Sequence, residues 1–172
     1  MQSGSPEALF HGPDNVKADD RRMNIAEFQQ RLAGGKVRCD LCPHHCVPAE
    51  GQDGLCRVRG VRNGQLQALC YGMISSAGLD PIEKKPLYHF HPGKKIFSIG
   101  GWGCNLACAF CQNWTISQQV GESPVRRPES VIAEALDAGS SGIAYTYNEP
   151  LVGFEFVRDC AVAAKKIGRA HV

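Results

Sequence analysis

The sequence of 172 residues has no apolar run that approaches the roughly 20 residues needed to span a membrane. Its first residues, Met1-Gln2-Ser3-Gly4, lack the basic and apolar regions of a secretory leader. It also lacks an excess of one charge, because 19 Lys and Arg residues nearly balance 17 Asp and Glu residues. Without a basic patch, binding to nucleic acid or to an anionic membrane is not favoured. These absences predict a soluble, cytoplasmic protein.

Cysteine is the residue that the sequence has in excess. Nine cysteines in so short a chain would indicate disulfides in a secreted protein, but in a cytoplasmic protein they favour metal binding or redox chemistry. Seven of them fall into two tight groups, whereas Cys70 and Cys160 stand alone. Cys160 lies in an apolar pattern of helical spacing, which predicts a buried core thiol. The two groups are therefore the candidate sites.

The second group consists of Cys104, Cys108 and Cys111, at C-x3-C-x2-C spacing directly after an apolar run and a glycine-rich turn. Thiols packed this closely indicate a shared inorganic centre. A structural zinc site needs four protein ligands, and no fourth Cys or His lies nearby in the sequence. Three thiolates suit a 4Fe-4S cluster that keeps one iron open to bind another molecule. The alternatives are a partial zinc site and unrelated core cysteines.

Four cysteines on turn-prone backbone form the first group, at C-x2-C-x3-C-x9-C spacing. They are Cys39, Cys42, Cys46 and Cys56. Four soft ligands are enough to close a tetrahedral shell, and a closed shell indicates a structural role. The spacing predicts a structural metal, with zinc favoured, a second iron–sulfur cluster as the next interpretation and a metal-free thiol cluster as the third. His44 or His45 could replace one cysteine, or the pair could be solvated.

The chain before residue 94 divides into segments of different periodicity. Residues 1–21 mix Pro, Gly, Asp and His without periodicity and are interpreted as a flexible tail. Apolar residues at helical spacing predict a short helix over residues 22–33. Apolar and polar residues alternate over residues 57–77 around Asn63-Gly64, which predicts a small hairpin. Residues 78–93 contain three prolines and should run extended, either as a connecting strap or lining a pocket with lysines and histidines.

Strand and helix patterns alternate after residue 94. The expected elements are a strand over residues 95–99, a helix from Pro128 to a stop at Gly139, a strand over residues 142–147, a helix over about 152–167 and the start of a strand at 169–172. This order predicts a parallel sheet with right-handed crossovers. In such sheets the side chains that do chemistry gather at the C-terminal ends of the strands. The second cysteine group follows the first strand, and Asn148 and Glu149 follow the second.

The spacing of the second group, with Phe110 before its last cysteine, resembles the signature of radical S-adenosylmethionine enzymes. Four further stretches resemble one family of that superfamily, the radical enzyme of the AmmeMemoRadiSam system, which is related to the pyruvate formate-lyase activating enzyme. They are Leu41-Cys42-Pro43-His44-His45-Cys46, Asp80-Pro81-Ile82-Glu83-Lys84-Lys85-Pro86-Leu87-Tyr88-His89-Phe90, Cys111-Gln112-Asn113-Trp114 and Tyr145-Thr146-Tyr147-Asn148-Glu149-Pro150. The resemblance covers about residues 22–172. It implies an α/β fold in which residues 94–172 begin a partial (β/α)6 barrel and residues 22–93 form a small cysteine-rich lobe.

The resemblance also implies the chemistry. Cys104, Cys108 and Cys111 would ligate a 4Fe-4S cluster whose open iron binds S-adenosylmethionine, and Phe110 would lie against the adenine. An electron from the reduced cluster would break a carbon–sulfur bond and release methionine and a 5'-deoxyadenosyl radical, which abstracts hydrogen from an unidentified substrate. The implied partners are an electron donor such as flavodoxin or ferredoxin and a substrate that could be a protein, for example a Memo-like or AMMECR-type companion.

Asn148 and Glu149 occupy the place of a Gly-Gly-Glu-Pro-like element that helps to hold the methionyl amino group in glycyl-radical activating enzymes. The stretch Tyr147-Asn148-Glu149-Pro150 keeps Glu and Pro but not the glycines. The resemblance implies that Glu149, and Asn148 beside it, contact S-adenosylmethionine, since a carboxylate can accept hydrogen bonds from an ammonium group. The alternative role of Glu149 is that of an acid at a helix N-terminus.

The chain departs from that family in length, because family members continue with further strands that complete the barrel. We therefore interpret residues 1–172 as an N-terminal fragment or truncated product with two strands and the start of a third. An open parallel sheet of this size would leave apolar faces uncovered. The alternative function is a catalytically inactive fragment that acts as a zinc- or cluster-stabilised binding module.

Overall fold

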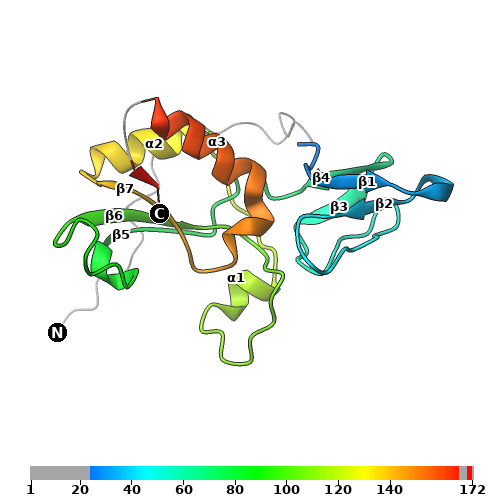
Figure 1. The fold of residues 1–172 in the computed structure, drawn as a ribbon, viewed down its shortest axis with the longest axis horizontal. Helices are drawn as coiled ribbons and strands as arrows, with labels where there is room; N and C mark the ends of the chain where they lie inside the picture. The colour runs from blue at the N-terminus through cyan, green and yellow to red at the C-terminus, as the bar shows by residue number, and fades with distance from the viewer. Residues whose placement is uncertain (1–23, 167–169, 172) are drawn as a thin grey trace.

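The computed structural model describes residues 24–166 and 170–171, so the tail predicted for residues 1–21 lies outside the described residues. The fold is mixed α/β. Figure 1 shows a lobe of short strands, β1 to β4, at one end and a sheet covered by helices α2 and α3 at the other. None of the described helices is long and apolar enough to cross a membrane.

Two antiparallel pairs of strands form the lobe. The pairs are β1 (Gln29–Arg31) with β2 (Val37–Cys39), and β3 (Arg59–Arg62) with β4 (Gln65–Ala68). The second pair confirms the predicted hairpin, because Asn63 and Gly64 both have positive φ, 54° and 68°, as a type I′ turn requires. The core of the lobe contains Val37, Val61 and Leu66, which come from three of the four strands.

The helix predicted over residues 22–33 is wrong for the described part of that range. Ile25 forms a bridge with Gln67, and the Ala26 N–H donates to the Leu66 carbonyl at 2.8 Å. The segment therefore runs beside β4, and Ala26 is buried in the core of the lobe. Hydrogen bonds to the hairpin and this burial outweigh a weak local helix propensity, which a short segment cannot convert into a stable helix.

The main sheet has four strands in the order β5-β6-β7-β8. They are β5 (Ser76–Pro81), β6 (Lys95–Gly100), β7 (Gly142–Tyr145) and β8 (Ala170–His171). β6, β7 and β8 are mutually parallel, which confirms the predicted order of parallel strands. Arg169 and Val172, the ends of the predicted third strand, lie outside the described residues. β5 runs antiparallel to β6 and was not predicted as a strand, because Gly78 and Pro81 are typical of connections rather than strand interiors.

Two helices pack against one face of the sheet. α2 spans Pro128–Asp137, and α3 spans Phe154–Lys165 after a 3-10 turn at Pro150–Gly153. Pro128 in the first turn of α2 and Gly139 after its end, with φ of 67°, agree with the predicted start and stop signals. Both predicted helices are therefore present, with α3 beginning slightly later than expected.

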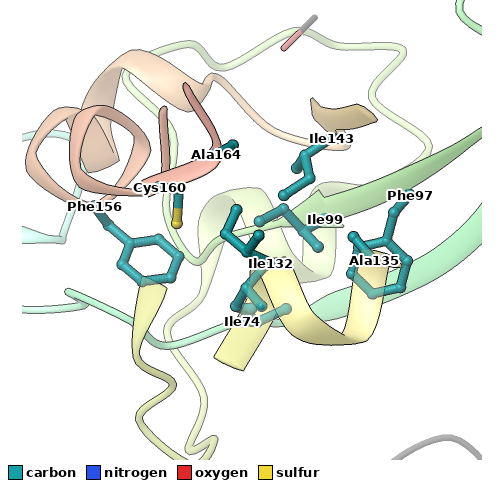
Figure 2. Packing of buried hydrophobic residues seen from close by; sticks show 10 residues of the cluster. Ile74, Phe97, Ile99, Ile132, Ala135, Ile143, Phe156, Cys160 and Ala164 are labelled. Atoms are coloured by element: carbon teal, nitrogen blue, oxygen red, sulfur yellow. The ribbon is translucent and has the colours of Figure 1, made fainter. Parts of the chain in front are cut away.

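The main core lies between these helices and the sheet. Figure 2 shows strand residues facing helix residues across this core. The side chains labelled there are Ile74, Phe97, Ile99, Ile132, Ala135, Ile143, Phe156, Cys160 and Ala164. Cys160 is fully buried among them, as predicted for a core thiol. The sequence predicted that the apolar faces of the sheet would be left uncovered. On this side of the sheet that expectation is wrong, because α2 and α3 cover the face.

The strap packs on part of the opposite face of the sheet. Ile82 and Leu87 of the strap pack on Ile96 of β6 and Ala144 of β7. A short 3-10 helix, Ile82–Lys84, forms the part of the strap that follows β5. This packing agrees with the interpretation of a connecting strap, but the prediction that residues 78–93 run extended is wrong beyond Pro81, where the 3-10 helix and turns follow.

Asp80, at the end of β5, binds the strap through charged hydrogen bonds. Its carboxylate accepts hydrogen bonds from Lys84 Nζ at 2.9 Å and Lys85 Nζ at 2.8 Å, and the Tyr147 hydroxyl donates to it at 3.2 Å. Burial disfavours the charged carboxylate, but the hydrogen bonds from Lys85 and Lys84 outweigh it and hold the pKa of Asp80 well below its usual value of 3.8. Asp80 is therefore ionised in the folded protein at every ordinary pH.

We expect Asp80→Asn to lower the free energy of unfolding by about 1–3 kcal/mol at neutral pH, because two charge-assisted hydrogen bonds are weakened. The folded-state pKa is depressed, so this stabilisation is present above the ordinary pKa of 3.8 and is lost as the pH falls below it. Urea unfolding of both proteins at neutral and acidic pH measures the difference. It should shrink in acid, and a difference that does not change with pH would contradict this assignment.

A buried ion pair joins the lobe to α3. Arg59 of β3 is 2% exposed and Glu155 of α3 is 4% exposed. Arg59 Nη1 donates to both carboxylate oxygens of Glu155, at 3.0 and 2.8 Å, and its Nη2 donates to the Glu27 carbonyl. The lobe and the main sheet are therefore held in one arrangement by a contact that excludes water.

Candidate functional site

The second cysteine group lies on one loop, residues 101–113, which we call the cysteine loop. It leaves the C-terminal end of β6 and leads into α1, Trp114–Gln118. The end of β7 lies beside its start, because the Thr146 N–H donates to the Ile99 carbonyl at 2.8 Å. The structure therefore confirms that this loop lies at the C-terminal edge of the parallel strands, as predicted.

Asn148, which follows β7, holds the cysteine loop at its start. Its Oδ1 accepts a hydrogen bond from the Gly101 N–H at 3.2 Å, and its Nδ2 donates to the Gly103 carbonyl at 2.6 Å. At the other end of the loop, Asn113 Nδ2 donates to the Tyr147 carbonyl at 3.0 Å. The side-chain amide of Asn148 therefore positions the loop, and its predicted contact with S-adenosylmethionine stays a prediction.

We expect Asn148→Ala to loosen the start of the cysteine loop. The loss of two hydrogen bonds should lower the free energy of unfolding by about 1–3 kcal/mol. It should also speed hydrogen exchange of the Gly101 amide, which loses its acceptor. Asn113→Ala is the matched control, since it removes one side-chain amide from the far end of the loop. Equal Gly101 exchange rates in Asn148→Ala and the parent would contradict the positioning role.

Gly103 brings the cysteine loop against the lobe. Its φ is 75°, and a Cβ at this position would collide with the carbonyl oxygen of Cys56 and with Val58. Only glycine permits both the left-handed backbone and this close approach. The loop that contains the second cysteine group therefore packs directly on the loop that contains the last cysteine of the first group.

The three thiols of the cysteine loop differ in exposure: Cys104 is buried, Cys111 is half-buried and Cys108 is exposed. The Leu106 N–H donates to Cys104 Sγ at 3.4 Å, the kind of hydrogen bond that tunes a thiolate ligand. A turn joins the other two, with the Cys111 N–H donating to the Cys108 carbonyl at 3.1 Å. Cys111 Sγ also lies 3.8 Å from Ser117 Oγ.

All nine cysteines are free thiols, and within the described ranges no three Cys, His, Asp or Glu side chains converge tightly enough to hold a metal ion. The donor set nevertheless fits an iron–sulfur cluster by ligand type and number, because three reduced thiols share one short loop. The sequence prediction of Cys104, Cys108 and Cys111 as ligands therefore remains open and is taken up below as a proposal.

Phe110 belongs to the cysteine loop, and Glu149 follows β7. Phe110 is 91% exposed, so its ring face is free to stack on a ligand, and its predicted contact with adenine stays a prediction. Glu149 Oε1 accepts a hydrogen bond from the Leu151 N–H at 3.0 Å and caps the 3-10 turn, which is the alternative role foreseen for it. Glu149 and Asn148 also line a largely apolar cavity between the sheet, the lobe and α3.

The four cysteines of the first group line a second, smaller cavity at the edge of the lobe. Each histidine of the group uses one ring nitrogen in a hydrogen bond and keeps the other nitrogen available as a metal ligand, so the interpretation that one of them replaces a cysteine stays open. His44 Nε2 lies 2.8 Å from the Asn105 carbonyl oxygen and so must carry the proton, and His45 Nδ1 lies 2.9 Å from Asp40 Oδ1. The structure thus brings together the cysteines that the spacing predicted as one set.

The comparison with protein families identifies the part of the chain that contains this site. Residues 99–172 match the family model of the Radical SAM superfamily. These residues form a Radical SAM domain. The match includes the cysteine loop, Asn148 and Glu149, so the resemblance seen in the sequence is confirmed for this part of the chain at the level of the superfamily.

Two curated relatives of the chain come from Methanocaldococcus jannaschii. The uncharacterized protein MJ0808 is 45% identical over 153 residues, which cover 87% of this chain and 46% of the relative. The uncharacterized protein MJ0674 is 30% identical over 99 residues, which cover 56% of this chain and 24% of the relative. The chain thus matches less than half the length of either relative. No solved structure gives a significant match to the chain.

Sequence reasoning missed the ion pair that positions the lobe against the Radical SAM domain. Arg59 and Glu155 lie 96 residues apart, and nothing in their spacing links them. A signal existed in Glu155 itself, which stands between Phe154 and Phe156 in the apolar pattern of α3. An acid at such a position needs a buried cation as its partner.

Proposed function

We propose that the Radical SAM domain binds a 4Fe-4S cluster through Cys104, Cys108 and Cys111 and cleaves S-adenosylmethionine reductively. The observation that supports this most strongly is the position of the three thiols. They share one loop at the C-terminal end of β6, inside the region that matches the superfamily model. Three thiolates leave a fourth coordination position for the amino acid part of S-adenosylmethionine.

In this proposal the neighbouring side chains bind and orient S-adenosylmethionine. The exposed ring of Phe110 offers a face to the adenine, and the carboxylate of Glu149 offers an acceptor to the methionyl ammonium group. Asn148 holds the start of the loop through Gly101 and Gly103. The cluster would supply one electron for breaking the sulfur–carbon bond, after which hydrogen is abstracted from an unidentified substrate.

We infer further that the protein belongs to the AmmeMemoRadiSam radical enzymes. Support comes from the motifs around Cys42 and Asp80 and from the stretch that ends at Pro150. In this proposal β6, β7 and β8 are the first parallel strands of a partial barrel. The proposed partners are a flavodoxin- or ferredoxin-like electron donor and a protein substrate such as a Memo-like or AMMECR-type companion.

The function is tested by turnover of S-adenosylmethionine. The chain reconstituted with iron and sulfide and reduced with dithionite should release 5'-deoxyadenosine and methionine in equal amounts. A variant with Cys104→Ala should release neither, because it lacks one cluster ligand. A chain that retains its iron and sulfide but forms no 5'-deoxyadenosine would contradict the proposed reaction.

A further inference from the structure

We propose that Cys39, Cys42, Cys46 and Cys56 bind a single zinc ion that fastens the lobe beside the Radical SAM domain. These cysteines lie outside the residues that match the superfamily model. The proposal does not depend on the chemistry proposed for the cysteine loop, and it is tested in a variant that lacks that chemistry.

The backbone of the lobe gathers the four cysteines around one cavity. Cys39 ends β2, and its N–H donates to the Cys46 carbonyl at 2.9 Å. Gly54 lies against Cys46 so closely that a Cβ there would be 3.3 Å from the Cβ of Cys46. The Gly54 N–H in turn donates to the Arg59 carbonyl at 2.7 Å, which places Cys56 in a tight turn before β3. The chain from Cys39 to Cys56 therefore brings all four cysteines to the wall of the same small cavity.

The size of the cavity favours a single ion. Its volume is about 20 Å³, which leaves room for one water-sized sphere. Four thiolates around one ion form the closed tetrahedral shell that zinc adopts in structural sites. The closed shell of four thiolates therefore favours zinc over a second cluster, and the metal content measured below distinguishes the two.

Two buried polar atoms in the cavity wall have no hydrogen-bond partner within the described part of the chain. They are Arg59 Nε and Asn105 Oδ1, and both residues line the cavity. An unpaired buried N–H is costly unless something in the cavity accepts its hydrogen bond. Zinc-bound thiolates accept such bonds, and Cys39 already lies beside the Arg59 guanidinium. Arg59 Nε is therefore suited to donate to a zinc-bound thiolate, whereas Asn105 Oδ1 is an acceptor and does not bear on the occupant.

The four thiols share the cavity but do not yet meet at one point, in line with the absence of a tight ligand group among the described residues. Four partly negative sulfurs have no reason to converge until an ion neutralises them, so metal binding and final closure occur together. Since all four already line the cavity, closure requires side-chain rotation within the lobe. A small lobe with few core residues gains most from such a metal.

The test uses the full chain with Cys104, Cys108 and Cys111 all replaced by alanine, so that the cysteine loop cannot hold metal. After incubation with zinc and dialysis, this variant should retain about one zinc per chain, the number that a single tetrathiolate site binds. Adding Cys42→Ala or Cys56→Ala should abolish retention. Adding Cys70→Ala should not, since Cys70 is a nearby thiol that does not line the cavity. Loss of the radical chemistry cannot influence any of these results.

A second measurement keeps the proposal testable if a cysteine variant fails to fold. Cobalt substituted into the triple variant should show the intense visible absorption of a tetrahedral thiolate site, and zinc should displace it. No zinc retained, zinc retained equally by the Cys42→Ala and Cys56→Ala variants, or iron and sulfide in place of zinc would each overturn the proposal.

Discussion

Replacing Cys104, Cys108 or Cys111 with alanine should reduce the iron content of the reconstituted chain from about four atoms to nearly none, because each is one of the three protein ligands that we propose for a 4Fe-4S cluster. We expect complete loss of the cluster rather than partial loss, because two thiolate ligands are too few to retain it in aqueous solution. Iron and acid-labile sulfide measured on the same anaerobic sample give the result. Cys104→Ala should be the clearest case, because this thiol is buried and has an N–H donor.

The matched control is Cys70→Ala, because Cys70 is a half-buried thiol that belongs to neither group. It should leave iron and sulfide unchanged. Zinc must be counted separately in the same samples, since the lobe is proposed to bind it. Iron and sulfide retained at the parent level in any one of the three loop variants would rule out the assigned ligand set.

Glu155→Ala should lower the free energy of unfolding by about 3–5 kcal/mol, the largest stability effect that we expect for a single substitution here. The substitution leaves the Arg59 charge buried without its partner. It also removes the acceptor of the Glu27 N–H, which donates to Glu155 Oε1 at 2.7 Å. Hydrogen bonds and the charge of Glu155 keep the pKa of Arg59 above its usual value against the effect of burial, so the guanidinium remains charged. Urea unfolding at neutral pH measures the loss.

A second ion pair in the same lobe provides the control. Arg62 and Asp53 lie 2.7 Å apart, close to the 2.8 Å of Arg59 and Glu155, but their side chains are 32% and 37% exposed. Asp53→Ala should therefore cost only about 0–1 kcal/mol. The double change Arg59→Met with Glu155→Leu should recover part of the loss, because it removes both buried charges. If Glu155→Ala and Asp53→Ala lower the free energy of unfolding equally, burial does not increase the contribution of the Arg59–Glu155 pair to stability.

Local signals in the sequence predicted the second half of the fold well. The start of α2 at Pro128 and its stop before Gly139 follow from local backbone chemistry, which depends little on the rest of the chain. The hairpin turn at Asn63 and Gly64 is of the same kind. The parallel order of β6, β7 and β8 followed from the alternation of strands and helices, which restricts the topology strongly.

The first half of the chain was harder to predict because its structure depends on distant partners. Residues near Ile25 have apolar spacing compatible with a helix, yet they pair with the hairpin more than 40 residues later. The strand β5 contains Gly78 and ends at Pro81, and it exists because β6 supplies its hydrogen bonds at the sheet edge. Neither pairing leaves a local pattern, so periodicity alone could not reveal them.

The site shows the same division between local and distant information. The spacing of Cys104, Cys108 and Cys111 is local, and it indicated both the loop and its place after a strand. The hydrogen bonds of Asn148 with Gly101 and Gly103 connect the ends of two strands, and the sequence alone could not reveal them. The sharing of one cavity by the four cysteines of the first group was foreseen from spacing, but the buried Arg59 beside them was not.

The central claim is that the cysteine loop holds a cluster with one iron open to S-adenosylmethionine. Electron paramagnetic resonance of the reduced, reconstituted chain tests it most directly, before and after addition of S-adenosylmethionine. The account predicts a 4Fe-4S signal that changes on addition, because the open iron gains a ligand. A signal that is indifferent to S-adenosylmethionine, or a chain that takes up zinc and no iron, would contradict it.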